Sequence, residues 1–367
     1  MLKVCGKKEF IDRVENIGQI ICFGAGKRIA NLKELYQETN VLKKISFFVD
    51  NNIEKQKTVV NIGDKKIGVI SFEELRDRQL ENTVILIITA EYMPILLQLE
   101  QDNKLKNVDC YCLTHQLVLM AEELAMKKSV PDKIRISDKP LIPKVIHYCW
   151  FGKNPIPNQY KKWIESWKRF CPDYEIVEWN ENNYDITKNK YMMQAYENKK
   201  WGFVPDFARL DIIYHYGGIY LDTDVELIQN LDDLLYQKGF AGFEGDNYVA
   251  LGLGFGAVKE LPIIKEMLEY YNNIDFVNED GTLNLIASPV WQTELLLKKG
   301  LKLNGEYQIV KDLTIFPEKM LTGKNLGTRR IRLMPYTRSI HHYEGSWLDI
   351  RGKKNNLQLE LDINNYT

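Results

Sequence analysis

The stretch GGIYLDTDVE, residues 217–226, joins a glycine pair, a short apolar run and two carboxylates one residue apart. The apolar run at 219–221 predicts a short buried strand, and Asp222 and Asp224 follow where that strand ends. In extended backbone, residues i and i+2 point the same way, so both carboxylates can face one site. Open α/β sheets bind their ligands at the carboxyl ends of their strands. We therefore expect an α/β fold with a binding site at this strand end.

The carboxylate pair has two interpretations. Two like charges this close repel each other unless a cation lies between or beside them. A divalent metal would relieve the repulsion, and hard oxygen ligands suit Mg²⁺ or Mn²⁺ with positions left for water and phosphates. The alternative is a polar turn with both side chains in solvent. The Asp-x-Asp pattern by itself leaves both open.

Composition limits the class of function. The 367 residues predict two domains at about 150 residues each. The 49 basic and 50 acidic residues nearly cancel, so no overall field attracts nucleic acid, and we expect no nucleic-acid partner. The N-terminal residues lack the apolar core of a signal peptide, so we expect a cytoplasmic protein. The six cysteines form no Cys-x-x-Cys pair, which favours reduced, buried thiols over a zinc or redox site.

The first half of the chain alternates β-rich runs with amphipathic helical patterns, which predicts a Rossmann-like α/β domain over residues 1–134. Its first strand leads into Gly24-Ala25-Gly26, and Asp50 ends the second strand. This arrangement is typical of dinucleotide binding, although Ile29 stands where a third glycine is expected. A tight strand-to-helix turn without a nucleotide is the other interpretation. An NAD(P)-dependent oxidoreductase therefore remains an alternative function.

A charged, proline-containing segment follows, KKSVPDKIRISDKPLIPK, and predicts a linker with the domain boundary near residue 135. The second half, residues 135–367, again mixes strand and helix patterns, and glycines within its strands suggest bulges. We expect a second α/β domain with a mixed sheet.

An ordered set of motifs in this half carries a family resemblance. The motifs are IPKVIHYCWFG (142–152), SWKRFCPDYEIVEWN (166–180), PDFARLDIIYHYGGIYLDTDVE (205–226) and IHHYEGSW (340–347). Together they resemble the glycosyltransferase family of the yeast-type initiating α-mannosyltransferases and many bacterial capsule-building sugar transferases, with the capsular branch the closer likeness. They are also similar, more distantly, to the glucosyltransferase domains of the large clostridial toxins. The resemblance covers about residues 140–350 and excludes the first half.

The resemblance implies a GT-A fold, a UDP- or GDP-sugar donor and a divalent metal, Mn²⁺ or else Mg²⁺. In this family Asp222 meets the ribose and sugar side of the donor, and Asp224 ligates the metal that bridges to the diphosphate. His342 would complete a metal set of Asp222, Asp224 and His342, although a single histidine is also commonly structural. Asp206 and Arg209, three apart on one helical face, would grip donor hydroxyls; otherwise they form a surface ion pair.

Further residues follow from the same resemblance. Trp150 or Phe151 would stack on the base, unless either is core. Ser346 and Trp347 look like a C-terminal lid over the diphosphate, with Gly345 giving it freedom. On the first strand, His147 is expected to be a hydrogen-bonded core group or a group that supports the site residues from behind.

The acceptor side is less defined by the sequence. Ser288 and Thr293 lie where related enzymes form part of the acceptor wall. A basic cluster would touch an anionic acceptor or a membrane surface, or would form a solvated loop. That cluster consists of Arg329, Arg330, Arg332 and Arg338.

These features predict a metal-dependent, retaining hexosyltransferase that acts on a glycan or lipid-linked oligosaccharide in capsular or other surface polysaccharide synthesis. Retention of the anomeric configuration of the donor sugar is implied by the family resemblance alone. Peripheral association with the inner face of the membrane is compatible with this function. The alternatives are a toxin-like protein glycosyltransferase, a donor-binding protein without turnover, and the oxidoreductase named above.

Overall fold

The computed structural model describes residues 2–245, 247–345 and 350–365. The chain forms two compact units, Met1–Ala121 with Lys354–Thr367, and Glu122–Lys353. This division differs from the expected boundary near residue 135, and it assigns the C-terminal segment to the first unit. The reason is a buried contact: the Asp362 carboxylate accepts a hydrogen bond from the Tyr92 hydroxyl and lies 3.3 Å from His115 Nε2.

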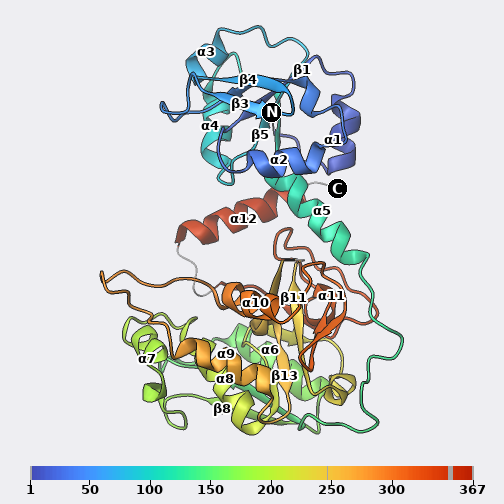
Figure 1. Cartoon of the computed structure of the whole chain (residues 1–367), viewed down its shortest axis with the longest axis vertical. Helices are drawn as coiled ribbons and strands as arrows, with labels where there is room; N and C mark the ends of the chain where they lie inside the picture. Colours follow the sequence, from blue (N-terminus) through green and yellow to red (C-terminus); the bar gives the residue numbers. More distant parts are fainter. Residues whose placement is uncertain (1, 246, 346–349, 366–367) are drawn as a thin grey trace. The chain divides into compact units, whose positions relative to one another are not determined.

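Six strands of the described chain form the sheet of the first unit, in the order β3-β4-β2-β1-β5-β6. Figure 1 labels β1, β3, β4 and β5 of this sheet. All pairings are parallel except that of β3 with β4. Side chains of the central strand β1 alternate between two apolar clusters, with Ile20 in one and Ile21 in the other, so both faces are buried. The strands are β1 (Gln19–Phe23), β2 (Ile45–Val49), β3 (Val59–Ile62), β4 (Lys65–Ile70), β5 (Thr83–Ile87) and β6 (Asp109–Cys112). The helices of this unit are α1 (Lys7–Val14), α2 (Ile29–Tyr36), α3 (Phe72–Arg76) and α4 (Met93–Gln101), together with the larger part of α5 (Leu113–Met126) and of α12 (Ile350–Asn364).

The glycine turn after β1 is closed by the chain itself. Gly24 has φ +111°, and a Cβ there would lie 2.6 Å from Thr89 Cγ2. The Ala25 amide donates to Asp50 Oδ2 at 2.7 Å, and Lys55 Nζ lies 3.2 Å from the same oxygen. Asp50, the acid that would bind a ribose in a nucleotide-binding unit, thus holds the glycine turn in place. This geometry favours the structural interpretation of Gly24–Gly26, while the Rossmann-like assignment itself stays a prediction.

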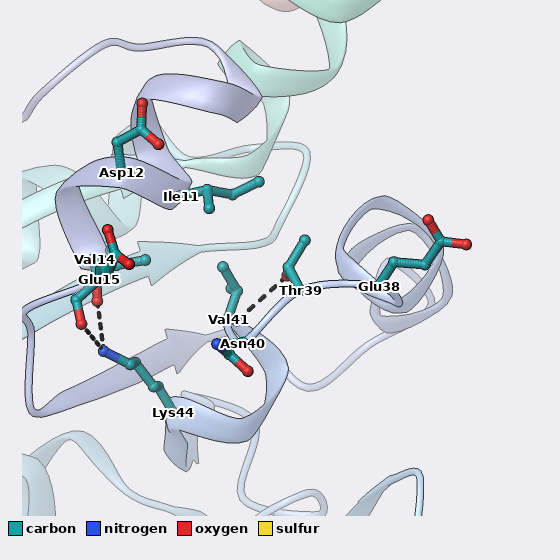
Figure 2. A pocket seen from close by; sticks show the side chains of 9 residues that line it. All are labelled: Ile11, Asp12, Val14, Glu15, Glu38, Thr39, Asn40, Val41 and Lys44. Carbon is teal, nitrogen blue, oxygen red and sulfur yellow. Dashed lines mark hydrogen bonds between the residues drawn. The ribbon is translucent and has the colours of Figure 1, made fainter.

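A surface hollow of about 300 Å³ lies in the same unit, between α1 and the segment 38–44. Figure 2 shows the side chains that line it. Lys44 Nζ reaches across it and donates to the carbonyl oxygens of Val14, Glu15 and Ile17. These are carbonyls at the end of α1, which a cation stabilises. Lys44 therefore acts as a helix cap, and we assign no binding function to this hollow.

The second unit contains a mixed sheet in the order β14-β15-β11-β13-β9-β7-β8, with β12 paired to β11. The mixed α/β architecture expected from the sequence is confirmed at that level. Its strands are β7 (Val145–Cys149), β8 (Glu175–Trp179), β9 (Gly218–Tyr220), β11 (Gly239–Glu244), β12 (Tyr248–Ala250), β13 (Phe255–Ala257), β14 (Gln308–Val310) and β15 (Leu313–Phe316). Its helices are α6 (Asn158–Phe170), α7 (Lys190–Glu197), α8 (Val204–Tyr216), α9 (Pro262–Tyr271), α10 (Ser288–Lys298) and α11 (Glu318–Leu321).

A separate two-stranded ribbon joins β10 (Val225–Leu227) to β16 (Ser339–His341). The pairing is antiparallel, and Val225 lies opposite His341. Since β10 begins directly after Asp224, this ribbon carries the late histidine segment to the Asp-x-Asp stretch.

The glycine pair that ends α8 is required by both backbone conformation and space. Gly217 and Gly218 have φ +68° and +102°, a region that disfavours other residues. A Cβ on Gly218 would lie 2.8 Å from the Val145 carbonyl oxygen. The chain can therefore turn from α8 into β9 in close contact with β7.

Within the described residues, no helix combines the length and the apolar character needed to cross a membrane.

His147 on β7 is buried, at 3% exposure, as the sequence predicted for a core group. Its Nε2 lies 3.0 Å from the Gly217 carbonyl oxygen, and its Nδ1 accepts from Trp179 Nε1 at 3.1 Å. Nδ1 is therefore the nitrogen that would take a second proton, and the Trp179 donor opposes this. Burial lowers the pKa of His147 from 6.5 to about 4.

A histidine whose pKa is lower in the folded state makes the protein less stable as pH falls from 6.5 toward 4. We expect the second unit to lose about 2 kcal/mol between pH 7 and pH 5 through His147, and His147→Gln to abolish most of this dependence. All seven tryptophans lie beyond residue 149, so tryptophan fluorescence during urea unfolding reports on the second unit. Equal pH dependence in both proteins would contradict the assignment.

Candidate functional site

Asp222 and Asp224 lie after β9, where the sequence placed them. The Tyr220 hydroxyl donates to Asp222 Oδ1 at 2.9 Å, and the Glu344 amide donates to Asp224 Oδ2 at 3.0 Å. Gly252 gives Asp222 its space, because a Cβ on Gly252 would lie 2.5 Å from Asp222 Oδ2. Both carboxylates are partly buried and fixed by the protein. The interpretation as a solvated polar turn does not fit this geometry.

The histidine beside the carboxylates is His341, and the choice of His342 from the sequence is corrected here. His341 Nε2 lies 3.2 Å from Asp224 Oδ1. His342 instead places Nε2 2.9 Å from Glu226 Oε2 and stacks its ring on Trp163, with 4.3 Å between ring centroids. Side chains of adjacent residues on a strand point to opposite sides. Because His341 pairs with Val225, the side chain of His341 lies on the side of Asp224 and that of His342 does not.

Asp206 and Arg209 form a buried ion pair and not a surface one. Arg209 Nη2 lies 2.8 Å from Asp206 Oδ1 and 3.8 Å from Asp222 Oδ1. Asp206 is 4% and Arg209 5% exposed. Burial raises the pKa of Asp206 to about 6 although the Arg209 charge acts to lower it. This pair therefore joins Asp222 in one connected charge network.

The two carboxylates of the Asp-x-Asp motif have different charge environments. Burial raises the pKa of Asp222, although Arg209 acts to lower it. Burial would also raise the pKa of Asp224, but the charge and hydrogen bond of His341 outweigh it and lower that pKa to about 2. Burial acts to lower the pKa of His341, and Asp224 outweighs it and raises it. Asp224 and His341 thus each stabilise the charged form of the other and constitute an ion pair.

These three side chains fit a divalent metal. Asp222, Asp224 and His341 each offer one ligand atom, and the three atoms lie within 4.8 Å of one another. Two carboxylate oxygens and one imidazole nitrogen suit Mn²⁺ and similar ions. His341 Nδ1 is buried and has no hydrogen-bond partner within the part of the chain that the structure describes.

Of the two aromatic residues proposed for the base, Phe151 is core and Trp150 is accessible. Phe151 is 6% exposed and packs against Tyr184. Trp150 is partly exposed, donates from Nε1 to the Asn154 carbonyl oxygen, and packs against Tyr160. Burial raises the pKa of Tyr160 to about 12, and the charges of Glu344 and Asp224 act in the same direction.

The remaining sequence candidates divide between the site and the framework. Ser288 is buried and acts to lower the pKa of the Asp206 carboxyl, whereas Thr293 Oγ1 accepts a hydrogen bond from the Val249 amide in the core. Gly345 has φ +57°. Ser346 and Trp347 lie outside the described residues.

The basic cluster is largely neutralised by the protein. Arg338 bonds Gln229 and lies 3.3 Å from Asp233. Arg330 and Arg332 each lie 3.8 Å from Glu122. These contacts favour a structural role over contact with an anionic acceptor.

Comparison with known proteins agrees with this geometry. Residues 157–241 match the family model described as "Glycosyltransferase sugar-binding region containing DXD motif". The matched residues are therefore similar to the sugar-binding region of DXD-type glycosyltransferases. The matched segment contains α6, β9, the Asp206–Arg209 pair and the two aspartates, but not His341.

Curated relatives carry mannosyltransferase names. Inositol phosphoceramide mannosyltransferase 1 of Schizosaccharomyces pombe is 33% identical over 114 residues, 27% of this chain and 33% of the relative. Mannosyl phosphorylinositol ceramide synthase CSH1 of Saccharomyces cerevisiae is 27% identical over 231 residues, 60% of this chain and 58% of the relative. The chain thus spans about a third of the length of the first of these relatives. These names support a transferase.

Among solved structures, PaToxG Glycosyltransferase is similar over 51% of this chain and 76% of that chain, with 16% identity and a TM-score of 0.35.

The two adjacent histidines provide a matched test of the metal assignment. We expect His341→Ala to weaken Mn²⁺ binding by about tenfold or more, since even outer-shell changes at metal sites cost this much. His342→Ala should leave Mn²⁺ affinity within about twofold and lose only packing against Trp163. Calorimetric titration of each protein with Mn²⁺ measures both. The reverse order of effects would restore His342 as the ligand.

Proposed function

We propose that this chain is a metal-dependent, retaining glycosyltransferase that moves a hexose from a nucleoside diphosphate to a hydroxyl of a glycan or lipid-linked acceptor. One observation carries the proposal: a buried Asp206–Arg209 pair adjoins a cluster of Asp222, Asp224 and His341, and both aspartates of the cluster lie in the matched DXD-type region. A buried charge network at the carboxyl ends of strands is costly unless a ligand uses it. Sugar hydroxyls and a metal-bound diphosphate are suitable ligands for it.

Each group has a defined task in this proposal. Asp224, His341 and Asp222 hold the divalent metal, which when bound neutralises charge on the leaving diphosphate. Asp206, Arg209 and Asp222 bind hydroxyls of the sugar and ribose, because buried charged groups make strong hydrogen bonds. The accessible ring of Trp150 stacks on the base. No side chain is assigned as general base, since in a retaining reaction of this kind a leaving phosphate oxygen can accept the proton.

The proposed sugar, acceptor and biological role are supported by separate observations. The names of the yeast relatives favour mannose as the transferred sugar and a lipid-linked acceptor. A role in capsular or other surface polysaccharide synthesis, at the cytoplasmic face of a membrane, rests on the sequence resemblance. Transfer to a protein is the toxin-like alternative. An oxidoreductase loses support because Asp50 and the Ala25 amide already bond each other.

The proposal predicts metal-dependent donor binding. In a thermal-shift panel of UDP-glucose, UDP-galactose and GDP-mannose, one donor should stabilise the protein with Mn²⁺ and not without it. A donor present at about 100 times its dissociation constant adds about 2.7 kcal/mol. Asp224→Ala should remove this stabilisation while the protein remains folded. Equal stabilisation of wild type and Asp224→Ala in the presence of a chelator would contradict the metal role.

Retention is testable separately from donor identity. The donor identified by the panel should yield a product whose new glycosidic bond keeps the anomeric configuration of the donor. Proton NMR of the anomeric signal during the first turnovers measures this directly. An inverted product would preserve the transferase proposal but exclude the retaining mechanism.

A further inference from the structure

A third carboxylate, Glu244, lies at the same edge of the sheet as the Asp-x-Asp stretch. Strand β11 pairs antiparallel with β13, and β13 pairs antiparallel with β9, so β9 and β11 run parallel. Phe240, Gly256 and Ile219 form one row across these strands. Asp222 follows that row by three residues and Glu244 by four. Both side chains therefore emerge near the carboxyl ends of parallel strands, where ligands bind.

The charged neighbours of Glu244 include His341, one of the residues proposed to hold the metal. Its carboxylate lies within electrostatic range of His341, Glu318 and Arg329. Enough protein surrounds Glu244 for burial to raise its pKa, yet part of the residue remains accessible. Asp222, Asp224 and His341 share this combination of burial and partial access. Glu244 is therefore similar to these three residues in its burial and its access to solvent.

The hydrogen bonding of Glu244 differs from that of its neighbour Glu318. Glu318 accepts from Asn325 and from the Gly245 amide, and it lies 3.2 Å from Lys319 Nζ. Those bonds make Glu318 part of the framework. The Glu244 carboxylate accepts no hydrogen bond and forms no ion pair within residues 2–245, 247–345 and 350–365, while the Glu244 backbone pairs with Tyr248 in the β11–β12 ladder. A carboxylate in such surroundings gains most when a ligand supplies donors.

We propose that Glu244 binds a hydroxyl of the hexose being transferred and so distinguishes a nucleotide sugar from the bare nucleoside diphosphate. The inference rests on the proposed function. The diphosphate would lie at the Asp224–His341 side, and the sugar is bonded directly to it. The sugar is therefore the first hydroxyl-bearing group that comes near a carboxylate beside His341. The phosphates themselves are repelled by Glu244, so its contact is with the sugar.

This assignment gives the sugar contacts on two sides. Asp206 and Arg209 approach Asp222 from α8, and Glu244 approaches from β11 beside His341. Asp206, Arg209 and Asp222 are already paired with one another. Glu244 is the carboxylate that keeps its full accepting capacity for a ring hydroxyl. A site that hydrogen-bonds a hydroxyl discriminates strongly against a ligand that lacks it.

Paired affinities test the inference. Dissociation constants are measured by calorimetry with Mn²⁺ for UDP-glucose against UDP and for GDP-mannose against GDP. In wild type, the sugar form of the matching pair should bind more tightly than its diphosphate. Glu244→Gln should weaken the sugar form by about tenfold or more, the ratio for one hydrogen bond to a charged group, and leave the diphosphate within about twofold. Glu244→Asp should restore part of the difference in affinity between the nucleotide sugar and the nucleoside diphosphate.

Glu175→Gln is the matched control, because Glu175 is an exposed carboxylate at the start of β8 and should change neither affinity. Unchanged affinities in Glu244→Gln would overturn the inference and leave the proposed function standing. Equal weakening of sugar and diphosphate would also overturn it, since Glu244 would then act through the metal or the fold. Failure of the wild type to bind any of these nucleotides with Mn²⁺ would reject the proposed function itself, and the inference with it.

Discussion

The pairing of β10 with β16 is the contact on which the site depends. Three residue pairs align a strand that follows Asp224 with one that ends at His341, and the His342 amide also donates to the Asp224 carbonyl oxygen. A ribbon this short is stable only when packed on a larger framework. Here Val225 and Leu227 are fully buried in the core of the second unit. Because the ribbon is packed in the core, it fixes the positions of Asp224 and His341 relative to each other.

Charge balance is the second organising constraint. Arg209 is buried between Asp206 and Asp222, and His341 is paired with Asp224, so each cation compensates carboxylates that burial would otherwise neutralise. Removing such charges from water is costly, and their mutual attraction repays only part of the cost. Concentrating them at strand ends is therefore a feature of a binding site more than of a stable core. Glu244 extends the same arrangement without a pairing partner among the described residues.

The first unit illustrates how one motif can support two interpretations. Its glycine turn and following acid have the spacing of a nucleotide-binding unit, and the sheet is largely parallel. In the structure the Asp50 carboxylate accepts from the Ala25 amide, and Gly24 is needed for close approach to Thr89. Sequence spacing cannot separate the two interpretations because both require a small residue and an acid at these positions. The hydrogen-bond partners separate them.

The sequence by itself determined the class of fold and indicated Asp206, Arg209, Asp222 and Asp224 as site residues. Local periodicity and ordered motifs encode these features, since each depends on residues close together in the chain. Only the tertiary structure decided between His341 and His342, revealed Gly252 and Glu244, and placed the C-terminal helix with the first unit. Those outcomes depend on strand register and on contacts between distant segments, where a shift of one residue exchanges the two faces of a strand.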